Sequence, residues 1–544
     1  MKDRMEPHVK ALERETLLVS IIVSVLSAVI CMQIIARIGI TPNTSIIGAL
    51  LAMAIARIPI ASMAKFRSLD RQNLVQTMTS AAGFGAANCG LLAVCILFAF
   101  GDVRQLIPML VGSGIATLIG MYFVYRVYDS ELFPATGSWP PGVATAQALI
   151  AGDEGGRKGR LLFGGILLGA AGAALKIKPF LAAGLPMAGV GIAFIANTFA
   201  MVALALGLLV RGYFPEIASF LGGMGITGLP ADLGKTYIPH GVMIGAGIVS
   251  LIQAVIIITR KPGATPADAG RETYSVSREA TKKAIGMGFV LFLAGAAALA
   301  LISGAWSDMS AATLTLWVAW STISALVSPI LVGLCAMHSG WFPGFAISII
   351  FLSLGLFMGF PPVALALLTG YVASTGPCFA DMGYDLKTGW IIRGRGANPA
   401  YELDGRRQQM ISELIGGVIA MVVVGLLMNM HFQQNLIPPV SKVFAATIKA
   451  GSHPDILREL MIWSVAGAAL QFAGGAKKAL GVLFATGLLI KNPIYGIGLL
   501  AAVAIRLAFE KNHKELLELY GAGFIAGDGI YGFVNALGRS FGWW

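Results

Sequence analysis

The chain has 544 residues, of which 56% are hydrophobic and only 12% charged, and its mean hydropathy is +0.78. Soluble domains carry about 25% charged residues, so this composition excludes an ordinary soluble fold and predicts an all-α polytopic membrane protein. A formal net charge of +12 could indicate nucleic-acid binding, but Lys and Arg retained in cytoplasmic loops explain it better, and we expect no nucleic-acid partner.

The N-terminal region predicts the orientation of the chain. Its first apolar run, residues 17–40, is too long for a signal-peptide core and lacks a small-residue cleavage site, so we expect a retained membrane helix. Basic residues gather in the tail 1–16 and in segments 65–72, 260–283 and 387–407, whereas the turn 41–46 has none. The N-terminus and the central linker are therefore expected on the cytoplasmic side.

The longest polar segment, residues 260–283, lies almost at mid-chain and separates a first membrane half, 17–259, from a second, 284–544. Two pairs of segments are similar across it: RQNLVQTM (71–78) with RQQMISEL (407–414), and LLFGGILLGAAGAAL (161–175) with ELYGAGFIAGDGIYG (518–532). They suggest two weakly similar halves, although chance similarity in a glycine-rich chain is an alternative. Because both members of the first pair begin in basic loops, the repeats would be parallel.

The apolar runs suggest about 14 to 16 membrane helices. Segments 134–150, 214–229 and 474–490 are short for a span. Non-helical backbone at membrane depth is tolerated only where it is buried in protein or lines a wet cavity, and short segments interrupted by Gly or Pro mark the binding sites of transporters. We therefore expect broken or re-entrant helices lining a central cavity.

The sequence indicates no cofactor. Its five cysteines lack CxxC spacing and no Cys/His cluster is present, so a metal site is not expected. There is no Walker A motif for ATP and no G-x-G-x-x-G turn after a strand for a dinucleotide. The many glycines, as in Gly165-xxx-Gly169 and Gly523-xxx-Gly527, indicate close helix packing in lipid.

Three blocks carry a family resemblance: WPPGVATAQALIAGDEGG (139–156), YDLKTGWIIRGRGANPAYELDGRRQQMISELIG (384–416) and GFIAGDGIYG (523–532). They resemble, in this order, the F-P-E/S-G-x-A-x-A, D-L-K-T-G…R-x-Q and G-L-I-A-G-E segments of the oligopeptide transporter family, in its bacterial and yellow-stripe-like branches. The resemblance implies a secondary-active proton symporter that imports small peptides, modified peptides or metal-chelate complexes through the inner membrane of a bacterium. A homodimer is one option for its oligomeric state.

The first block departs from the family. Pro141 replaces an acidic or hydroxyl residue, Trp139 a phenylalanine and Gln147 a glutamate, which leaves the substrate open. We expect the prolines and glycines of 133–142 to break a helix so that backbone groups face the cavity, with a kink in a packed helix as the alternative. The candidate substrate-binding residues are Trp139, Pro141, Gly142, Thr145, Gln147, Tyr237, Asp381, Asp385 and Lys387, although a structural role at the cytoplasmic end is favoured for Asp385 and Lys387.

Three further residues are candidates for proton coupling, because an ionisable group inside a span costs about 2.5–3.5 kcal/mol and marks function. Asp528 lies among glycines and matches the acidic position of the third block, with a packing role as its alternative. Glu413 follows the basic RRQQ, so a salt bridge to Arg406 or Arg407 is equally expected. His240 is either a proton relay, a substrate contact or a satisfied interfacial histidine.

Two other functions remain open at this stage. A channel or facilitator for a small solute would have the same composition. An intramembrane enzyme would use Asp381 and Asp528 as a carboxylate pair, but the sequence has no catalytic motif such as H-E-x-x-H or G-x-S-x-G. We therefore expect a transporter and not an enzyme.

Overall fold

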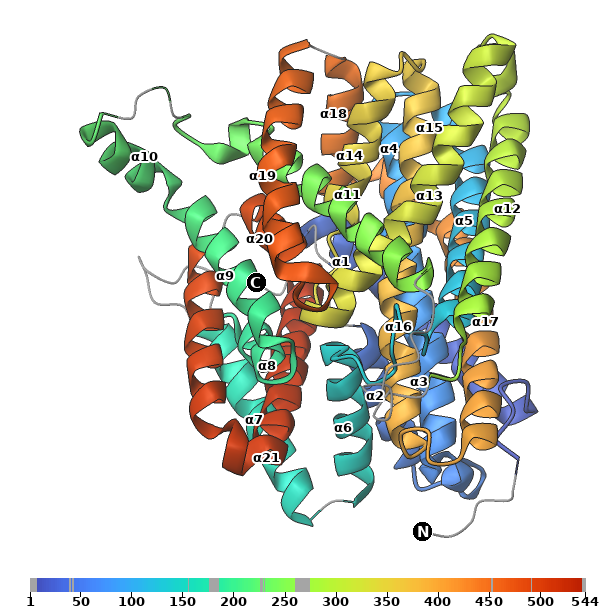
Figure 1. The fold of residues 1–544 in the computed structure, drawn as a ribbon. Coiled ribbons are helices and arrows are strands. Elements are labelled where there is room, and N and C mark those ends of the chain that lie inside the picture. Colours follow the sequence, from blue (N-terminus) through green and yellow to red (C-terminus); the bar gives the residue numbers. More distant parts are fainter. Residues whose placement is uncertain are drawn as a thin grey trace.

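The computed structural model confirms the all-α prediction: the residues it describes form helices α1 to α21 and short 3-10 or π segments, without a strand. It describes residues 7–540 except 39–40, 42–43, 155, 176–184, 226–227, 229, 260–273, 452–453 and 491. Most of the expected linker 260–283 therefore lies outside the described residues. The helices run side by side as elongated bundles (Figure 1).

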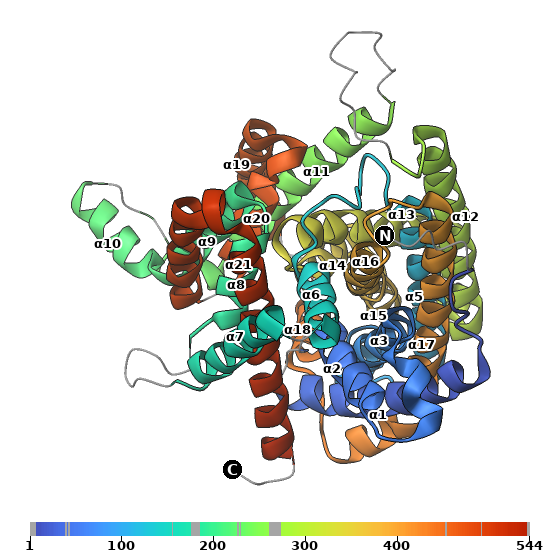
Figure 2. The same ribbon diagram turned by 90° about the horizontal axis from the view of Figure 1, so that it is seen from below.

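The helices form two groups. The large bundle comprises α1 (Arg14–Ile38), α2 (Thr44–Ala56), α3 (Leu69–Phe84), α4 (Leu92–Phe100), α5 (Leu106–Val127), α12 (Arg278–Ser303), α13 (Ala311–Ser339), α14 (Gly344–Phe357), α15 (Pro362–Ala373), α16 (Thr375–Ile392), α17 (Pro399–Gln433) and α18 (Pro439–Ala450). The small bundle comprises α7 (Gly156–Ala174), α8 (Met187–Ile195), α9 (Thr198–Gly212), α10 (Phe214–Gly223), α11 (Ile238–Thr259), α19 (Pro454–Lys478), α20 (Leu480–Leu489) and α21 (Pro493–Ser540). Helix α6 (Pro140–Glu154) lies between them and packs on both α16 and α21 (Figure 2).

The described residues contain both full-length spans and shorter apolar helices. Within the described residues, eight helical segments are long and apolar enough to cross a membrane, and α9 and α10 together form a ninth that is bent by 70°. Four shorter apolar helices accompany them, Thr44–Ala56, Ile238–Gln253, Gly344–Phe357 and Leu480–Leu489. The expected count of 14 to 16 also included short segments, and it stays a prediction because these helices are counted only within the described residues.

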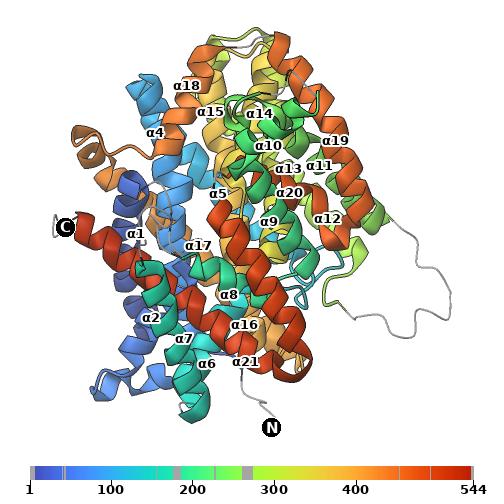
Figure 3. The same ribbon diagram turned by 90° about the vertical axis from the view of Figure 1, so that its left-hand side faces the viewer.

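The segments that resemble one another in sequence pack against each other in space. Helix α3, which contains RQNLVQTM, lies along α17, which contains RQQMISEL. Helix α7 crosses α21 (Figure 3) so closely that a Cβ atom on Gly523 would lie 2.7 Å from the Cα atom of Gly165. Glycine at this crossing lets the two backbones touch, as the glycine spacing predicts.

The break at residues 133–142 is held by helix α16. Trp139 has a left-handed φ of 38°, and its backbone N–H donates to Met337 O at 2.9 Å. The Lys387 ammonium donates to the carbonyl oxygens of Ala135 at 2.6 Å and Gly137 at 2.9 Å. These carbonyls therefore bind a side chain of the DLKTG block, whereas the sequence predicted that they face a cavity.

Candidate functional site

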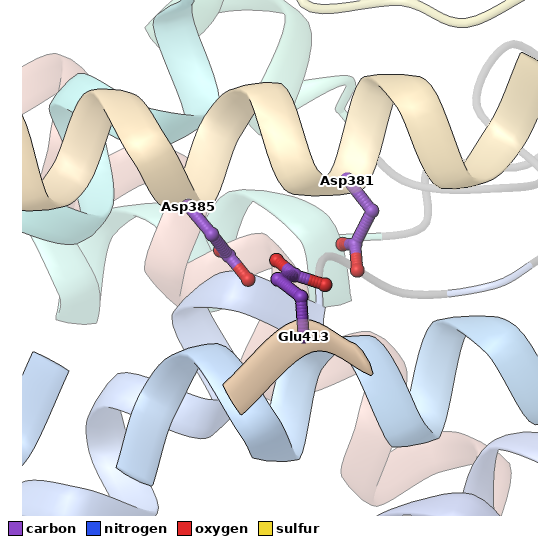
Figure 4. A group of neighbouring side chains, drawn as sticks. All are labelled: Asp381, Asp385 and Glu413. Atoms are coloured by element: carbon purple, nitrogen blue, oxygen red, sulfur yellow. The ribbon is translucent and has the colours of Figure 1, made fainter. Parts of the chain in front are cut away.

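Three carboxyl groups meet at the contact between α16 and α17. Asp381 and Asp385 are four residues apart on α16, so both side chains lie on one face of that helix. Glu413 extends from α17 toward them (Figure 4). One oxygen from each of the three lies within 4.8 Å of the others. We call these three residues the acidic triad.

Helices α2 and α3 supply hydrogen bonds to the two aspartates. Asp381 Oδ1 accepts hydrogen bonds from Thr44 Oγ1 at 3.0 Å and from Ser80 Oγ at 2.9 Å. Asp385 Oδ1 accepts hydrogen bonds from Ser45 Oγ at 2.7 Å and from Gln76 Nε2 at 2.6 Å. Thr44 and Ser45 are the first residues of the short helix α2, so its N-terminal dipole also favours negative charge here.

The other oxygens of the triad lack a hydrogen-bond donor in the part of the chain that the structure describes. Within the described residues, Asp381 Oδ2, Asp385 Oδ2 and both carboxyl oxygens of Glu413 accept no hydrogen bond. At most 3% of any of the three residues is exposed. The described residues provide no ion pair to the triad either: Arg406, one expected partner of Glu413, instead contacts Glu402 on its own helix.

Among the residues that the structure describes, the triad therefore has no balancing positive charge. Two carboxylate oxygens within 4.8 Å of each other repel by at least about 3.5 kcal/mol at an effective dielectric constant of about 20 when both groups are charged. A cation held among the oxygens removes this repulsion, and an all-oxygen set suits a proton or a hard metal ion. Asp385 and Glu413 are close enough to share a hydrogen bond when one of them is protonated. The arrangement can thus bind and release a cation.

The candidates of the first sequence block lie elsewhere, in the packed contact of α6 with α16. Pro141, Gly142 and Thr145 are buried in the first turns of α6, and Gln147 is half-buried. Trp139 is fully buried, and its indole N–H donates to Pro134 O at 3.1 Å. The carbonyl oxygen of Gly142 accepts from Thr388 at 3.1 Å, so the first and second sequence blocks contact one another.

The remaining candidates belong to the small bundle. Asp528 accepts a hydrogen bond from the backbone N–H of Ala188 at 2.6 Å, at the start of α8. Tyr237 and His240 form a tilted ring pair with centroids 5.7 Å apart. Neither Asp528 nor His240 joins the triad. Of the three proton-coupling candidates, the structure thus brings only Glu413 together with other acidic side chains.

Sequence reasoning missed the hydrogen-bond donors of α2 and α3. One signal was available: the α3 segment RQNLVQTMTS (71–80) is largely polar although it belongs to a 32-residue candidate span. Polar side chains within a span need partners, so this segment should face other polar groups. Its Gln76 and Ser80 do so.

Comparisons with known proteins identify the family. The family model described as OPT oligopeptide transporter protein matches residues 15–248 and 232–538, so the two matched segments together span almost the entire chain. A search of curated proteins found no match. The eight candidate membrane helices agree with an integral membrane transporter. The chain belongs to the OPT oligopeptide transporter family.

Proposed function

We propose that this protein is a secondary-active importer of small peptides, modified peptides or metal-chelate complexes, and that protons bound by the acidic triad drive it. The observation that carries this proposal is the set of three buried carboxyl groups, Asp381, Asp385 and Glu413, without a balancing positive charge among the described residues. The proposed setting is the inner membrane of a bacterium, with the N-terminus in the cytoplasm. The proposed relationship within the family is to its bacterial and yellow-stripe-like branch.

The burial of the triad supports a carrier that closes around its coupling ion. Buried charges are expensive unless they are paired, so three closely spaced carboxylates favour a conformation in which a cation is bound. Release of that cation leaves the negative charges unbalanced, which favours opening to water. A conformational change linked to cation loading is what a symporter requires.

The energy available is adequate. One proton that moves down a membrane potential of 100 mV supplies about 2.3 kcal/mol. Because about 1.4 kcal/mol corresponds to a factor of ten, one proton sustains roughly a 40-fold gradient of a neutral solute. A single proton on the triad would therefore allow useful accumulation.

The test is uptake into proteoliposomes with and without an inward proton gradient. The solutes are tri- to hexapeptides, glutathione and iron-chelate complexes. Wild-type protein should accumulate one class only when the gradient is present. Glu413→Gln should lose that accumulation and still exchange labelled for unlabelled solute, because the amide keeps the shape of the side chain without binding a proton.

The matched control is Glu515→Gln, since the side chain of Glu515 is 71% exposed. This variant should accumulate solute as the wild type does. Full accumulation by Glu413→Gln would remove the triad from coupling. Accumulation that follows a sodium gradient would reject the proton as coupling ion, and equilibration without accumulation would indicate a facilitator.

A further inference from the structure

A second site lies between the two bundles, in a cavity of about 340 Å³. Its wall includes the ends of three of the four short apolar helices: the beginning of α11 at Pro239 and His240, the beginning of α14 at Phe345, and the end of α20 at Leu489. Interrupted helices that meet around a cavity are the usual setting of a transporter's solute site. The triad residues do not line this cavity.

The polar groups of the cavity favour an anion. Arg211, which is 8% exposed, reaches it from the last turn of α9 and pairs with Asp232. Nδ1 of His240 is buried and has no hydrogen-bond partner within the described residues. Both α11 and α14 begin here, and Pro343 provides no side-chain cap for α14. The amides of a first helical turn lack intrahelical partners and carry partial positive charge, so they attract anions.

Apart from Thr486, the side chains of the rest of the wall are apolar or aromatic. They include Trp341, Phe342 and Phe345, together with Val440 and Val443 of α18. Ligand pockets range from about 300 to 1,000 Å³, so this cavity is at the small end of that range. It suits a compact solute that carries a carboxylate at one end and an apolar or aromatic group at the other.

We propose that this cavity binds the transported solute and recognises its carboxylate through Arg211, assisted by His240 and the start of α14. The proposal rests on the proposed transport function and specifies its substrate as a small carboxylate-bearing molecule. Arg211 can meet a carboxylate with two parallel N–H donors. Asp232 holds the guanidinium when no solute is bound, and a solute carboxylate would compete with it.

The cavity wall contacts a helix that lines the triad. The ring of Phe342 packs edge-on against Phe84, with centroids 5.1 Å apart. Phe84 is the last residue of α3, four residues after Ser80, which donates to Asp381. A π-helical segment, Gly85–Leu91, follows directly, and such segments are frequent at functional sites. Solute in the cavity and a cation on the triad would therefore both act on α3.

The test measures binding at equilibrium, without any gradient, by the change in tryptophan fluorescence that depends on Trp341. The probes are Ala-Phe, Phe-Ala and Ala-Phe-Ala, each beside its C-terminal amide, together with ferric citrate. The free acids should quench the fluorescence and bind at least tenfold more tightly than the amides. Trp341→Phe should remove most of the signal.

Two substitutions probe the guanidinium. Arg211→Lys keeps the charge but loses the paired donors. Gly234→Ala places a methyl group against Nη2 of Arg211 and displaces it without altering the arginine. Each should weaken binding of the free acid at least tenfold and leave the amide unchanged. If ferric citrate is the only probe that binds, the solute that carries the recognised carboxylate is a metal chelate. If the peptides bind, the solute is a peptide.

Equal binding of acid and amide, or free-acid binding unaffected by both substitutions, would overturn the proposal. Failure of the transport mechanism has a different signature. If binding depends on Arg211 but Glu413→Gln accumulates solute normally, only the role of the triad fails. If accumulation requires Glu413 but binding ignores Arg211 and Gly234, only the cavity assignment fails.

Discussion

The large and small bundles are held together by different means. In the large bundle, hydrogen-bonding side chains connect α2, α3 and α16, and its core contains fully buried rings such as Trp317 and Phe379. In the small bundle, helices touch through glycines, and a Cβ atom on Gly523 would lie 2.7 Å from Gly165. Directional bonds can fix the carboxyl groups of Asp381 and Asp385 in place, whereas glycine contacts bring backbones together and leave no room for a side chain. An added methyl group should therefore do most damage in the small bundle, and changes of polar groups should matter most in the large one.

The largest effect is expected from Gly527→Ala in α21. A Cβ atom there would overlap the carbonyl oxygen of Ile166 on α7, and because this is a backbone atom the two helices would have to move apart. We expect a loss of about 3 kcal/mol in the free energy of unfolding, at the upper end for overpacked sites. The midpoint of thermal unfolding in detergent measures it. Gly529→Ala is the matched control, because a Cβ atom at Gly529 meets nothing within 4 Å, and it should be neutral or stabilising by up to about 1 kcal/mol. Equal destabilisation by Gly527→Ala and Gly529→Ala would show that α7 and α21 are not tightly packed where they cross.

The next effect has the opposite sign and belongs to the large bundle. Glu413→Gln should stabilise the protein by about 2 kcal/mol, since an amide removes one buried carboxylate and can donate to a free oxygen of Asp381 or Asp385. Thermal unfolding at pH 7.5 measures the gain, with Glu515→Gln as the exposed control. A variant that is less stable than the wild type would mean that Glu413 already has a partner, and the charge imbalance of the triad would then be rejected.

A smaller loss is expected where α16 holds the break before α6. Lys387→Met keeps the length of the side chain but removes the hydrogen bonds to Ala135 and Gly137. The expected cost is about 1–2 kcal/mol, together with faster cleavage of the segment 129–138 by proteinase K. Lys158→Met, at a side chain that is 46% exposed, is the control. Unchanged cleavage in Lys387→Met would show that other contacts, such as that of Trp139 with Met337, are sufficient to hold this segment.

The sequence was sufficient for the fold class and for several important residues, but not for their arrangement. Hydropathy identified the long apolar spans, but it cannot show where a short apolar helix such as α14 begins inside a bundle. The blocks that resemble the family contain Asp385, Lys387 and Glu413. Their convergence depends on how α16 packs against α17, and spacing along one chain does not reveal this. Arg211 was missed because its importance depends on helix ends that are far apart in sequence.

The smallest effect is expected at Asp528, which the sequence favours for proton coupling. In the structure its carboxylate accepts a hydrogen bond from Ala188 at the start of α8, which is the role of an N-cap supplied by another helix. Asparagine caps helices about as well as aspartate, so Asp528→Asn should change stability by less than about 0.5 kcal/mol and leave gradient-driven accumulation within twofold of the wild type. Asp528→Leu cannot accept the bond and should cost about 1 kcal/mol. If Asp528→Asn folds normally but no longer accumulates solute, the proton-binding group lies in the small bundle. The contrast between a large bundle that binds the ion and a small bundle that packs through glycine would then fail.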